Sequence, residues 1–217
     1  MKRSGWVSLI VMILFTLVVS TQVFSQDGTS VQIVSTQGSG SADMLQAAYS
    51  NEANLRDRYL AYAGRADEEG YGQVASMFRA IARGEDVHAA RLAALISPSA
   101  QVAMVTAAEA VIPMSTKENL QSALAQQIQE RDAIYPRLLQ RAQAEKNKPL
   151  LQTVRNNLAA EPAHLAWFRQ AMEDLDGYKG ENIDFYVCTQ CGNTVRALRG
   201  PKCEICSASK DKFERVR

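Results

Sequence analysis

The two histidines of the chain, His88 and His164, each end a Glu-x-x-His motif, and the two motifs lie 76 residues apart. Each motif interrupts a series of apolar residues spaced three and four apart, which is the pattern of the buried face of an α-helix. A glutamate and a histidine at this spacing project from the same helical face, one turn apart. Any fold of this chain must therefore bury two acid–histidine pairs inside packed helices.

Two further helical stripes each contain one acid near the midpoint. Glu52 interrupts the stripe from Leu45 to Tyr62, and Glu130 interrupts another stripe later in the chain. This later stripe consists of Leu120, Ala123, Gln127, Glu130, Ile134 and Leu138. In a bundle of four helices the midpoints of the stripes meet at one depth, so four glutamates converge in the apolar core.

The order of the segments favours one bundle topology. The first helix pair contains Arg56-Asp57 and the second contains Arg131-Asp132, so the pairs are related by an internal repeat. The connection between the pairs, residues 97–113, is long enough to cross the length of a bundle. Ser115 or Thr116 can cap the helix that follows it. The sequence therefore predicts an all-α, ferritin-like four-helix bundle with one long crossover.

Ionised carboxylates among apolar side chains cost several kcal/mol each unless a positive charge offsets them. A Glu-x-x-His pair on each of two helices, with one glutamate from each other helix, is the ligand set of di-iron carboxylate bundles. Oxygen and imidazole ligands suit iron or manganese better than copper. We therefore interpret six residues as metal ligands, with a buried hydrogen-bond or salt-bridge network as the alternative. They are Glu52, Glu85, His88, Glu130, Glu161 and His164.

Pro162 is an unusual residue inside the fourth helix, directly after Glu161. Proline removes the amide that would bond Leu158, at a cost of about 3 kcal/mol in a regular helix, and disfavours helical geometry at the residue before it. We predict a kink or a π-bulge at residues 158–162 that turns Glu161 toward the metals.

The four cysteines of the chain form two pairs, Cys188-x-x-Cys191 and Cys203-x-x-Cys206. Two such pairs can make a tetrahedral four-thiolate site for zinc or iron. The spacing alone slightly favours a zinc ribbon, and in an exported protein two disulfides are a third possibility. Beside a di-iron centre, an iron site that transfers one electron makes better chemical sense.

The N-terminal residues predict export. Two basic residues precede an apolar run from Trp6 to Val19, which is short for a bilayer span, so residues 1–25 fit a cleaved signal peptide or, alternatively, an N-terminal anchor. Residues 26–41 are polar and rich in glycine and serine, as in a flexible tether. We expect a periplasmic protein, or a membrane-anchored one facing outward if the segment is uncleaved.

With 24 basic and 23 acidic residues, the chain has almost no net charge, so its composition does not favour nucleic acid as a partner.

Together these motifs resemble the rubrerythrin family over nearly everything after the tether. The residues that carry the resemblance are NEANLRDRYLAYAGRADEEG, FRAIARGEDVHAARL, KENL, ERDAIYPRLLQRAQAE, EPAHLAWF, YVCTQCG and PKCEIC. The resemblance implies a di-iron bundle at residues 42–178 and a rubredoxin-like four-cysteine domain at residues 179–217. It further implies a homodimeric peroxidase that reduces hydrogen peroxide to water. The electrons would come from an unidentified donor and pass through the Fe(Cys)4 site, across the dimer interface.

The resemblance also assigns roles to single residues. It implies that His88 exchanges with Glu130 as an iron ligand when the oxidation state changes. It places Tyr59 and Tyr135 beside the metals, although both tyrosines can equally be core residues with satisfied hydroxyls. Gln127 departs from the family pattern, because the family usually has a further ligating glutamate there.

Two other functions stay open on the sequence. One is an iron-binding or ferroxidase-like protein whose four cysteines hold structural zinc. The other is a membrane-tethered interaction module with a degenerate metal site, which the neutral side chain of Gln127 would favour.

Overall fold

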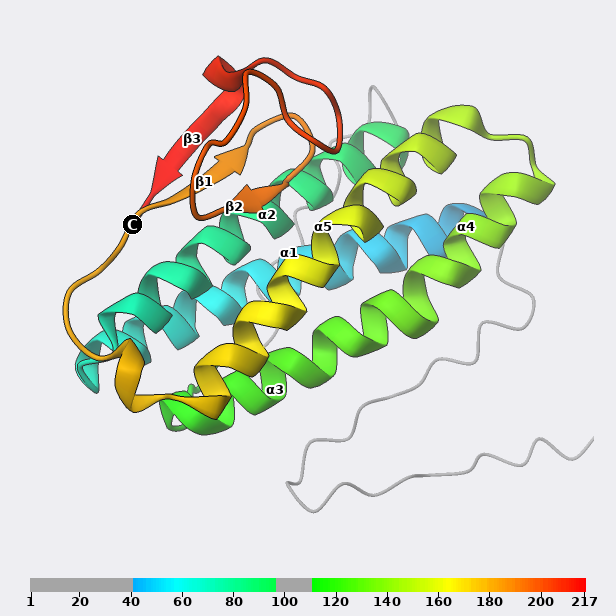
Figure 1. Cartoon of the computed structure of the whole chain (residues 1–217). Helices are drawn as coiled ribbons and strands as arrows, with labels where there is room; N and C mark the ends of the chain where they lie inside the picture. Colours follow the sequence, from blue (N-terminus) through cyan, green and yellow to red (C-terminus); the bar gives the residue numbers. More distant parts are fainter. Residues whose placement is uncertain (1–40, 97–110) are drawn as a thin grey trace, which may run out of the picture. The chain divides into compact units, whose positions relative to one another are not determined.

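The computed structural model of the chain describes residues 41–96 and 111–217. The predicted signal segment, the predicted tether up to residue 40 and most of the predicted crossover lie outside the described residues. Figure 1 shows long helices packed side by side, with a small three-stranded unit against them. Within the part that the structure describes, no helix is long and apolar enough to cross a membrane.

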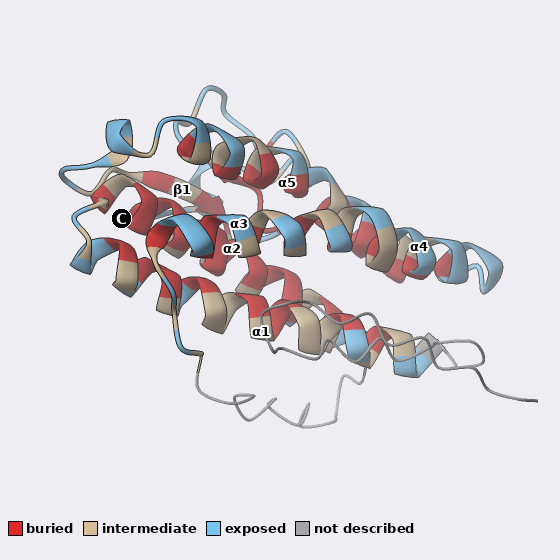
Figure 2. Cartoon of the chain, turned by 90° about the horizontal axis from the view of Figure 1, so that it is seen from below, coloured by how far each residue is buried: buried red, intermediate tan, exposed pale blue. Residues whose placement is uncertain are grey.

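Two helical layers make the bundle. Helix α1 (Ser41–Glu68) packs along α2 (Gly72–Ile96), and α5 (Lys148–Glu173) packs against α3 (Thr116–Gln129) and α4 (Tyr135–Ala144). Figure 2 shows that the buried residues of these helices face one another across the layers. The four predicted helical segments are therefore present.

Local sequence signals fix where the second layer begins. Ser115 caps α3 in a capping box, in which its side chain accepts a hydrogen bond from the Glu118 amide and the Glu118 carboxylate bonds back to the Ser115 amide. The predicted start of this helix is thus confirmed. Asn147 caps α5 by accepting from the Leu150 amide at 3.1 Å, and Pro149 occupies the first turn, where its missing amide costs nothing.

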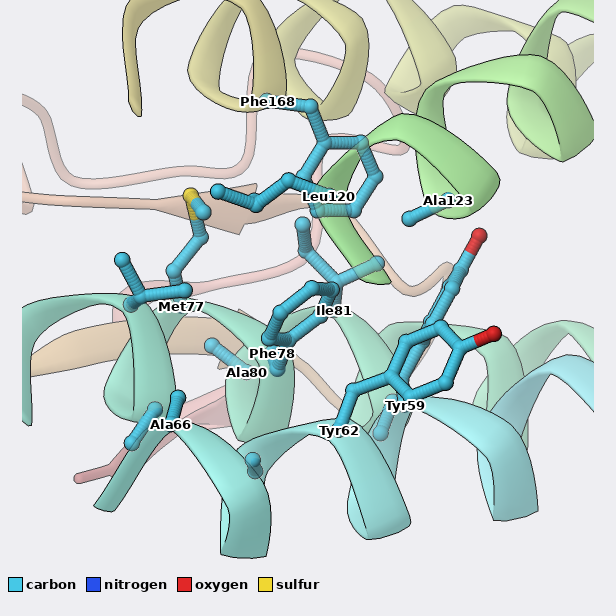
Figure 3. Close-up of a cluster of buried hydrophobic side chains, with 14 of the residues drawn as sticks. Tyr59, Tyr62, Ala66, Met77, Phe78, Ala80, Ile81, Leu120, Ala123 and Phe168 are labelled. Atoms are coloured by element: carbon cyan, nitrogen blue, oxygen red, sulfur yellow. The ribbon is translucent and has the colours of Figure 1, made fainter. Parts of the chain in front are cut away.

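The apolar core consists of two clusters, and the acids lie between them. One cluster contains the aromatic rings of Tyr59, Tyr62, Phe78 and Phe168, whose centroids lie 5.5–6.3 Å apart. Figure 3 shows these side chains from α1, α2 and α5 meeting Leu120 from α3. The other cluster is built around residues such as Leu45, Leu92, Leu138 and Val154. On each helix the buried acid falls between its contributions to the two clusters.

A π-helical turn, η1 (Glu130–Ile134), separates α3 from α4. In it the Tyr135 amide donates to the Glu130 carbonyl, five residues back, just before Pro136. This extra residue shifts the phase of the helix, so Tyr135 is buried where the stripe predicted Ile134, which is only partly buried. Ile134 is therefore a wrong member of the predicted core stripe.

A π-bulge at residues 158–162, one of the two predicted distortions, is wrong, because α5 is a continuous α-helix from Lys148 to Glu173. The predicted kink stays a prediction. Pro162 lies on the exposed side of this helix. Water can take the hydrogen bond that the proline removes, and packing of the buried face holds the helical geometry.

The C-terminal residues form a three-stranded antiparallel sheet in the order β2-β1-β3. Strand β1 (Phe185–Cys188) is central and pairs with β2 (Thr194–Val195) and β3 (Phe213–Val216). Two 3-10 turns, η2 (Asp176–Tyr178) and η3 (Lys210–Lys212), precede β1 and β3. The sheet packs against α2 and α5, and Phe185 meets Trp167 edge to face at 5.2 Å.

Candidate metal centres

Two groups of buried ligand atoms share one carboxylate inside the bundle. Glu52, Glu85 and His88 form one group, and Glu85, Glu161 and His164 form the other; in each, the ligand atoms lie within 4.8 Å of one another. All five residues are at most 1% exposed. Glu85 therefore occupies the place of a bridging ligand between two cation positions.

The unpartnered atoms of these groups fit cations. Glu52 Oε2 and both carboxylate oxygens of Glu161 are buried without a hydrogen-bond partner among the described residues. Unsatisfied oxygens of this kind cost about 1–3 kcal/mol each, more when charged. A divalent cation would satisfy the carboxylates in place, whereas a hydrogen-bond or salt-bridge network would leave them unsatisfied. The donor set of carboxylate oxygen and imidazole suits iron or manganese.

Burial also perturbs the acid–base chemistry of the cluster. Burial, followed by the charge of Glu161, raises the pKa of Glu85 to about 8, and burial raises the pKa of Glu161 to about 7. Burial likewise raises the pKa of Glu52 and lowers the pKa of both histidines. The metal-free site therefore favours neutral side chains, which is the opposite of what an isolated salt-bridge network needs. A cation reverses this preference by stabilising the carboxylates.

Glu130 lies beside the two groups, held by amide donors. Asn51 Nδ2 donates to Glu130 Oε1 at 2.6 Å, and Gln127 Nε2 donates to Glu130 Oε2 at 3.0 Å. Gln127 Nε2 also donates to Glu85 Oε1 at 2.9 Å, and Gln127 Oε1 lies 3.3 Å from His164 Nδ1. Gln127, which stands where the family usually has a glutamate, therefore lies inside the candidate metal site.

The two tyrosines have different surroundings. Tyr135, at the end of the π-helical turn, donates its hydroxyl hydrogen to Glu52 and accepts a hydrogen bond from Asn157 Nδ2 at 3.2 Å. The Tyr59 hydroxyl is buried near the Gln127 amide, but no hydrogen bond of normal geometry reaches it from the described residues. Burial raises the pKa of both phenols, so both stay protonated.

The four cysteines gather at one end of the small sheet as free thiols. The Sγ atoms of Cys188 and Cys206 lie 3.7 Å apart, and those of Cys191 and Cys203 lie 3.6 Å apart. Four sulfurs bound tetrahedrally to one metal at about 2.3 Å lie about 3.8 Å from one another. The thiols are therefore spaced for a shared metal ion and not for two disulfides.

A hydrogen bond joins the two metal-binding clusters directly. His88 Nε2 lies 3.1 Å from the carbonyl oxygen of Cys191, while His88 Nδ1 lies 2.9 Å from Glu85 Oε2. Gly192 allows this approach, because a Cβ atom there would overlap the His88 ring. Arg91 adds a second link by donating to the Gln190 carbonyl. The contact forms within one chain and does not require a second copy.

Sequence reasoning did not single out Asn51, Asn157 or the Cys191 carbonyl. Asn51 directly precedes Glu52, and Asn157 lies one turn before Glu161, so both had a positional signal. The Cys191 carbonyl belongs to the backbone and leaves no trace in the sequence.

Comparisons with known proteins agree with this geometry. The rubrerythrin family model matches residues 43–172. Rubrerythrin-2 of Clostridium acetobutylicum is 29% identical over 83% of this chain and 99% of its own length, and nigerythrin of Nitratidesulfovibrio vulgaris is 31% identical over 78% and 83%. A structure of fully reduced, all-ferrous nigerythrin has a TM-score of 0.73 and 28% identity, covering 91% of this chain and 98% of that one. The predicted fold class and the predicted family are confirmed.

Proposed function

This chain belongs to the rubrerythrin family, and we propose that it reduces hydrogen peroxide to water at a di-iron centre in the bundle. The reaction consumes two electrons and two protons for each peroxide and releases two water molecules. In this proposal the four cysteines hold one further iron, which returns electrons from an outside donor. The all-ferrous state of the nigerythrin structure supports iron as the native metal.

The observation that carries the proposal is the position of His88 between the two clusters. Its Nδ1 faces Glu85, and its Nε2 bonds the carbonyl of Cys191, a residue of the four-thiol site. A short path of covalent bonds and one hydrogen bond therefore runs between the two donor sets. A protein that only stored iron, with structural zinc in its tail, would gain nothing from this path.

When bound, the two irons would supply Lewis acidity and two electrons to the peroxide substrate. The residues that would hold them are Glu52, Glu85, His88, Glu161 and His164. Glu130 belongs to neither ligand group, and it would join them only by leaving its amide donors, as the exchange with His88 requires.

The surrounding residues would hold protons and exclude water. The Tyr135 hydroxyl orients Glu52 by donating to it, and Asn157 fixes the hydroxyl in turn. The Tyr59 hydroxyl has a hydrogen to donate and no partner among the described residues, so it can bind an oxygen atom of the substrate. The aromatic cluster around Tyr59 keeps bulk water from this side of the site.

We also propose that the protein works outside the cytoplasm, either in the periplasm after cleavage near residue 25 or held by an uncleaved N-terminal anchor that faces outward. The motif order of residues 1–25 supports this proposal. N-terminal sequencing of the mature protein from its native host separates the two forms. A mature protein that keeps residues 1–25 and stays in the soluble cytoplasmic fraction would contradict both.

The function is tested with the full-length, iron-loaded protein reduced anaerobically. Mixing it with hydrogen peroxide or with dissolved oxygen should oxidise it faster with peroxide, followed by the return of the red colour of ferric Fe(Cys)4. Oxidation that is as fast or faster with oxygen would contradict the peroxidase and support a ferroxidase-like protein. A colourless protein with zinc at the cysteines after expression in iron-replete medium would contradict electron transfer through the tail.

Gel filtration of the same sample tests whether the protein is a homodimer.

A further inference from the structure

We propose that Gln127 is a neutral metal ligand at the His164 position, so that the two metal positions carry different charge and fill one after the other. This inference rests on the di-iron centre of the proposed function and goes beyond it. Gln127 is fully buried in α3, on the face that meets Glu85 and His164.

The amide of Gln127 has only one satisfactory orientation. Its Nε2 donates to Glu85 Oε1 at 2.9 Å and to Glu130 Oε2 at 3.0 Å, which uses both of its hydrogens. When the two acids are ionised, as metal binding requires, rotating the amide by half a turn would place its oxygen against two carboxylate oxygens. The Oε1 atom is therefore fixed toward His164 Nδ1, at 3.3 Å.

The oxygen of Gln127 sits where a ligand atom should sit. His164 Nδ1 lies 3.3 Å from Gln127 Oε1, 3.4 Å from Glu161 Oε2 and 3.6 Å from Glu85 Oε1. Adjacent ligand atoms bound to one ion at about 2.0–2.2 Å lie about 3 Å apart. In the metal-free form His164 Nδ1 donates its hydrogen to Gln127 Oε1. A cation would take the place of that hydrogen, with Nδ1 and the three oxygens around it as one ligand set.

The two metal positions then differ by one carboxylate. Glu85 and Glu161 lie near both histidines, at 2.9 and 3.9 Å from His88 Nδ1 and at 3.6 and 3.4 Å from His164 Nδ1. The remaining oxygen ligand is Glu52 on the His88 side, at 3.9 Å, and Gln127 on the His164 side. Because hard cations bind more tightly as the charge of the ligands increases, the first ion should occupy the His88 position.

The alternative is that Gln127 binds no metal and only positions Glu85 and Glu130 through its two amide hydrogens, which we call the clasp role. Gln127→Glu separates the two roles by the sign of its effect, and Gln127→Met separates them by which binding event is lost. Gln127→Glu removes the amide donors but adds a charged ligand, so a ligand role predicts tighter binding of the second ion and a clasp role predicts weaker binding. Gln127→Met keeps the side-chain length but offers only a thioether, which is a poor ligand for a hard cation. It should abolish the second binding event.

The test is a cobalt(II) titration of the metal-free, full-length protein by calorimetry. Visible absorption follows the cysteine site separately, because thiolate-bound cobalt absorbs much more strongly than carboxylate-bound cobalt. In the natural protein we expect two unequal binding events in the bundle. In Gln127→Glu the second should tighten by about tenfold or more. Gln121→Glu makes the same change at an exposed position of the same helix and should leave both events unchanged.

Each result decides something. Weaker binding in both Gln127 variants, or unchanged binding in Gln127→Met, would overturn the ligand role and leave the di-iron proposal intact. Two equal events in the natural protein would also overturn it. No cobalt binding to the bundle of the natural protein would contradict the proposed function together with this inference. If Gln127→Glu does not fold, loss of only the second event in Gln127→Met, with the His88 position retained, still supports the inference.

Discussion

His88 and Cys191 are joined by a hydrogen bond of 3.1 Å between the Nε2 atom of the ring and the carbonyl oxygen of the cysteine. A carbonyl can only accept, so Nε2 must carry the hydrogen and Nδ1 keeps its lone pair. This tautomer directs Nδ1 at Glu85, 2.9 Å away. The cysteine domain therefore sets which nitrogen of His88 is available to a metal in the bundle.

Substituting Gly192 by alanine should separate the two clusters. The added Cβ would overlap the His88 ring, and Gly192 has a φ of +79°, which an alanine adopts only with strain of about 1–2 kcal/mol. We expect electron transfer from the cysteine iron to the bundle to slow by about ten- to a hundredfold. Stopped-flow absorption at the Fe(Cys)4 bands after peroxide mixing measures this rate.

Gly200→Ala is the matched control for this prediction, because the nearest atom to its added Cβ lies at 4.0 Å. It should transfer electrons at the natural rate. Equal rates in both variants would show that the contact with His88 does not carry the electrons.

Glu85→Gln should remove both metals from the bundle, because Glu85 belongs to both ligand groups. An amide at a bridging position cannot offer two charged oxygens, so the affinity of each position should fall by at least about tenfold. Metal analysis of the purified variant, corrected for the iron held by the cysteines, measures the loss. Asp86→Asn is the control, since Asp86 lies next in sequence but forms partly exposed ion pairs with Arg56 and Arg83. Retention of two metals in Glu85→Gln would contradict the bridging role.

The helical stripes predicted the bundle because the buried face of a helix requires apolar residues at spacings of three and four. They failed at Ile134 because apolar residues stand at both 134 and 135, so a spacing of four fitted the pattern as well as the five-residue spacing of the π-helical turn. The Pro136 that follows this turn is the same signal that led us to place a π-bulge before Pro162. Only the packed structure shows that a π-helical turn accompanies Pro136 and that none accompanies Pro162.

The sequence was enough to predict which residues are metal ligands, but not how their side chains are arranged relative to one another. Each glutamate and histidine stands out because a polar residue is rare on an apolar stripe. The orientation of Gln127 depends on where Glu85 and Glu130 place their oxygens, and that depends on the register of three helices. The link to Cys191 uses a backbone carbonyl, which every residue possesses.

The metal-free protein should lose stability as the pH rises from 6.5 to 8. The pKa of Glu85 is raised from 4.5 to about 8 in the folded protein, so the folded state binds more protons than the unfolded chain in this window. Stability therefore decreases with pH, by about 1–2 kcal/mol from this residue. The buried histidines, whose pKa is lowered from 6.5, change stability in the opposite direction only below that window.

Urea unfolding of the metal-free protein at several pH values measures this dependence. The loaded protein should show the reverse slope, because metal binding needs ionised carboxylates and releases protons. Glu85→Gln should reduce the slope of the metal-free form, and the raised pKa of Glu161, about 7, should leave a smaller slope of the same sign. Slopes of the same sign in the free and loaded forms would contradict the assignment of the titrating groups to the metal site.

Phenylalanine substitutions should separate the two buried tyrosines. Tyr135→Phe removes the donor to Glu52 and leaves Asn157 Nδ2 without its acceptor, so the free energy of unfolding should fall by about 1–3 kcal/mol. Tyr59→Phe removes a hydroxyl that has no partner among the described residues, so stability should be unchanged or slightly higher. If the Tyr59 hydroxyl binds the substrate, this variant should keep both metals and full stability yet be oxidised more slowly by peroxide. A natural rate in stable, fully loaded Tyr59→Phe would instead make this residue part of the packing alone.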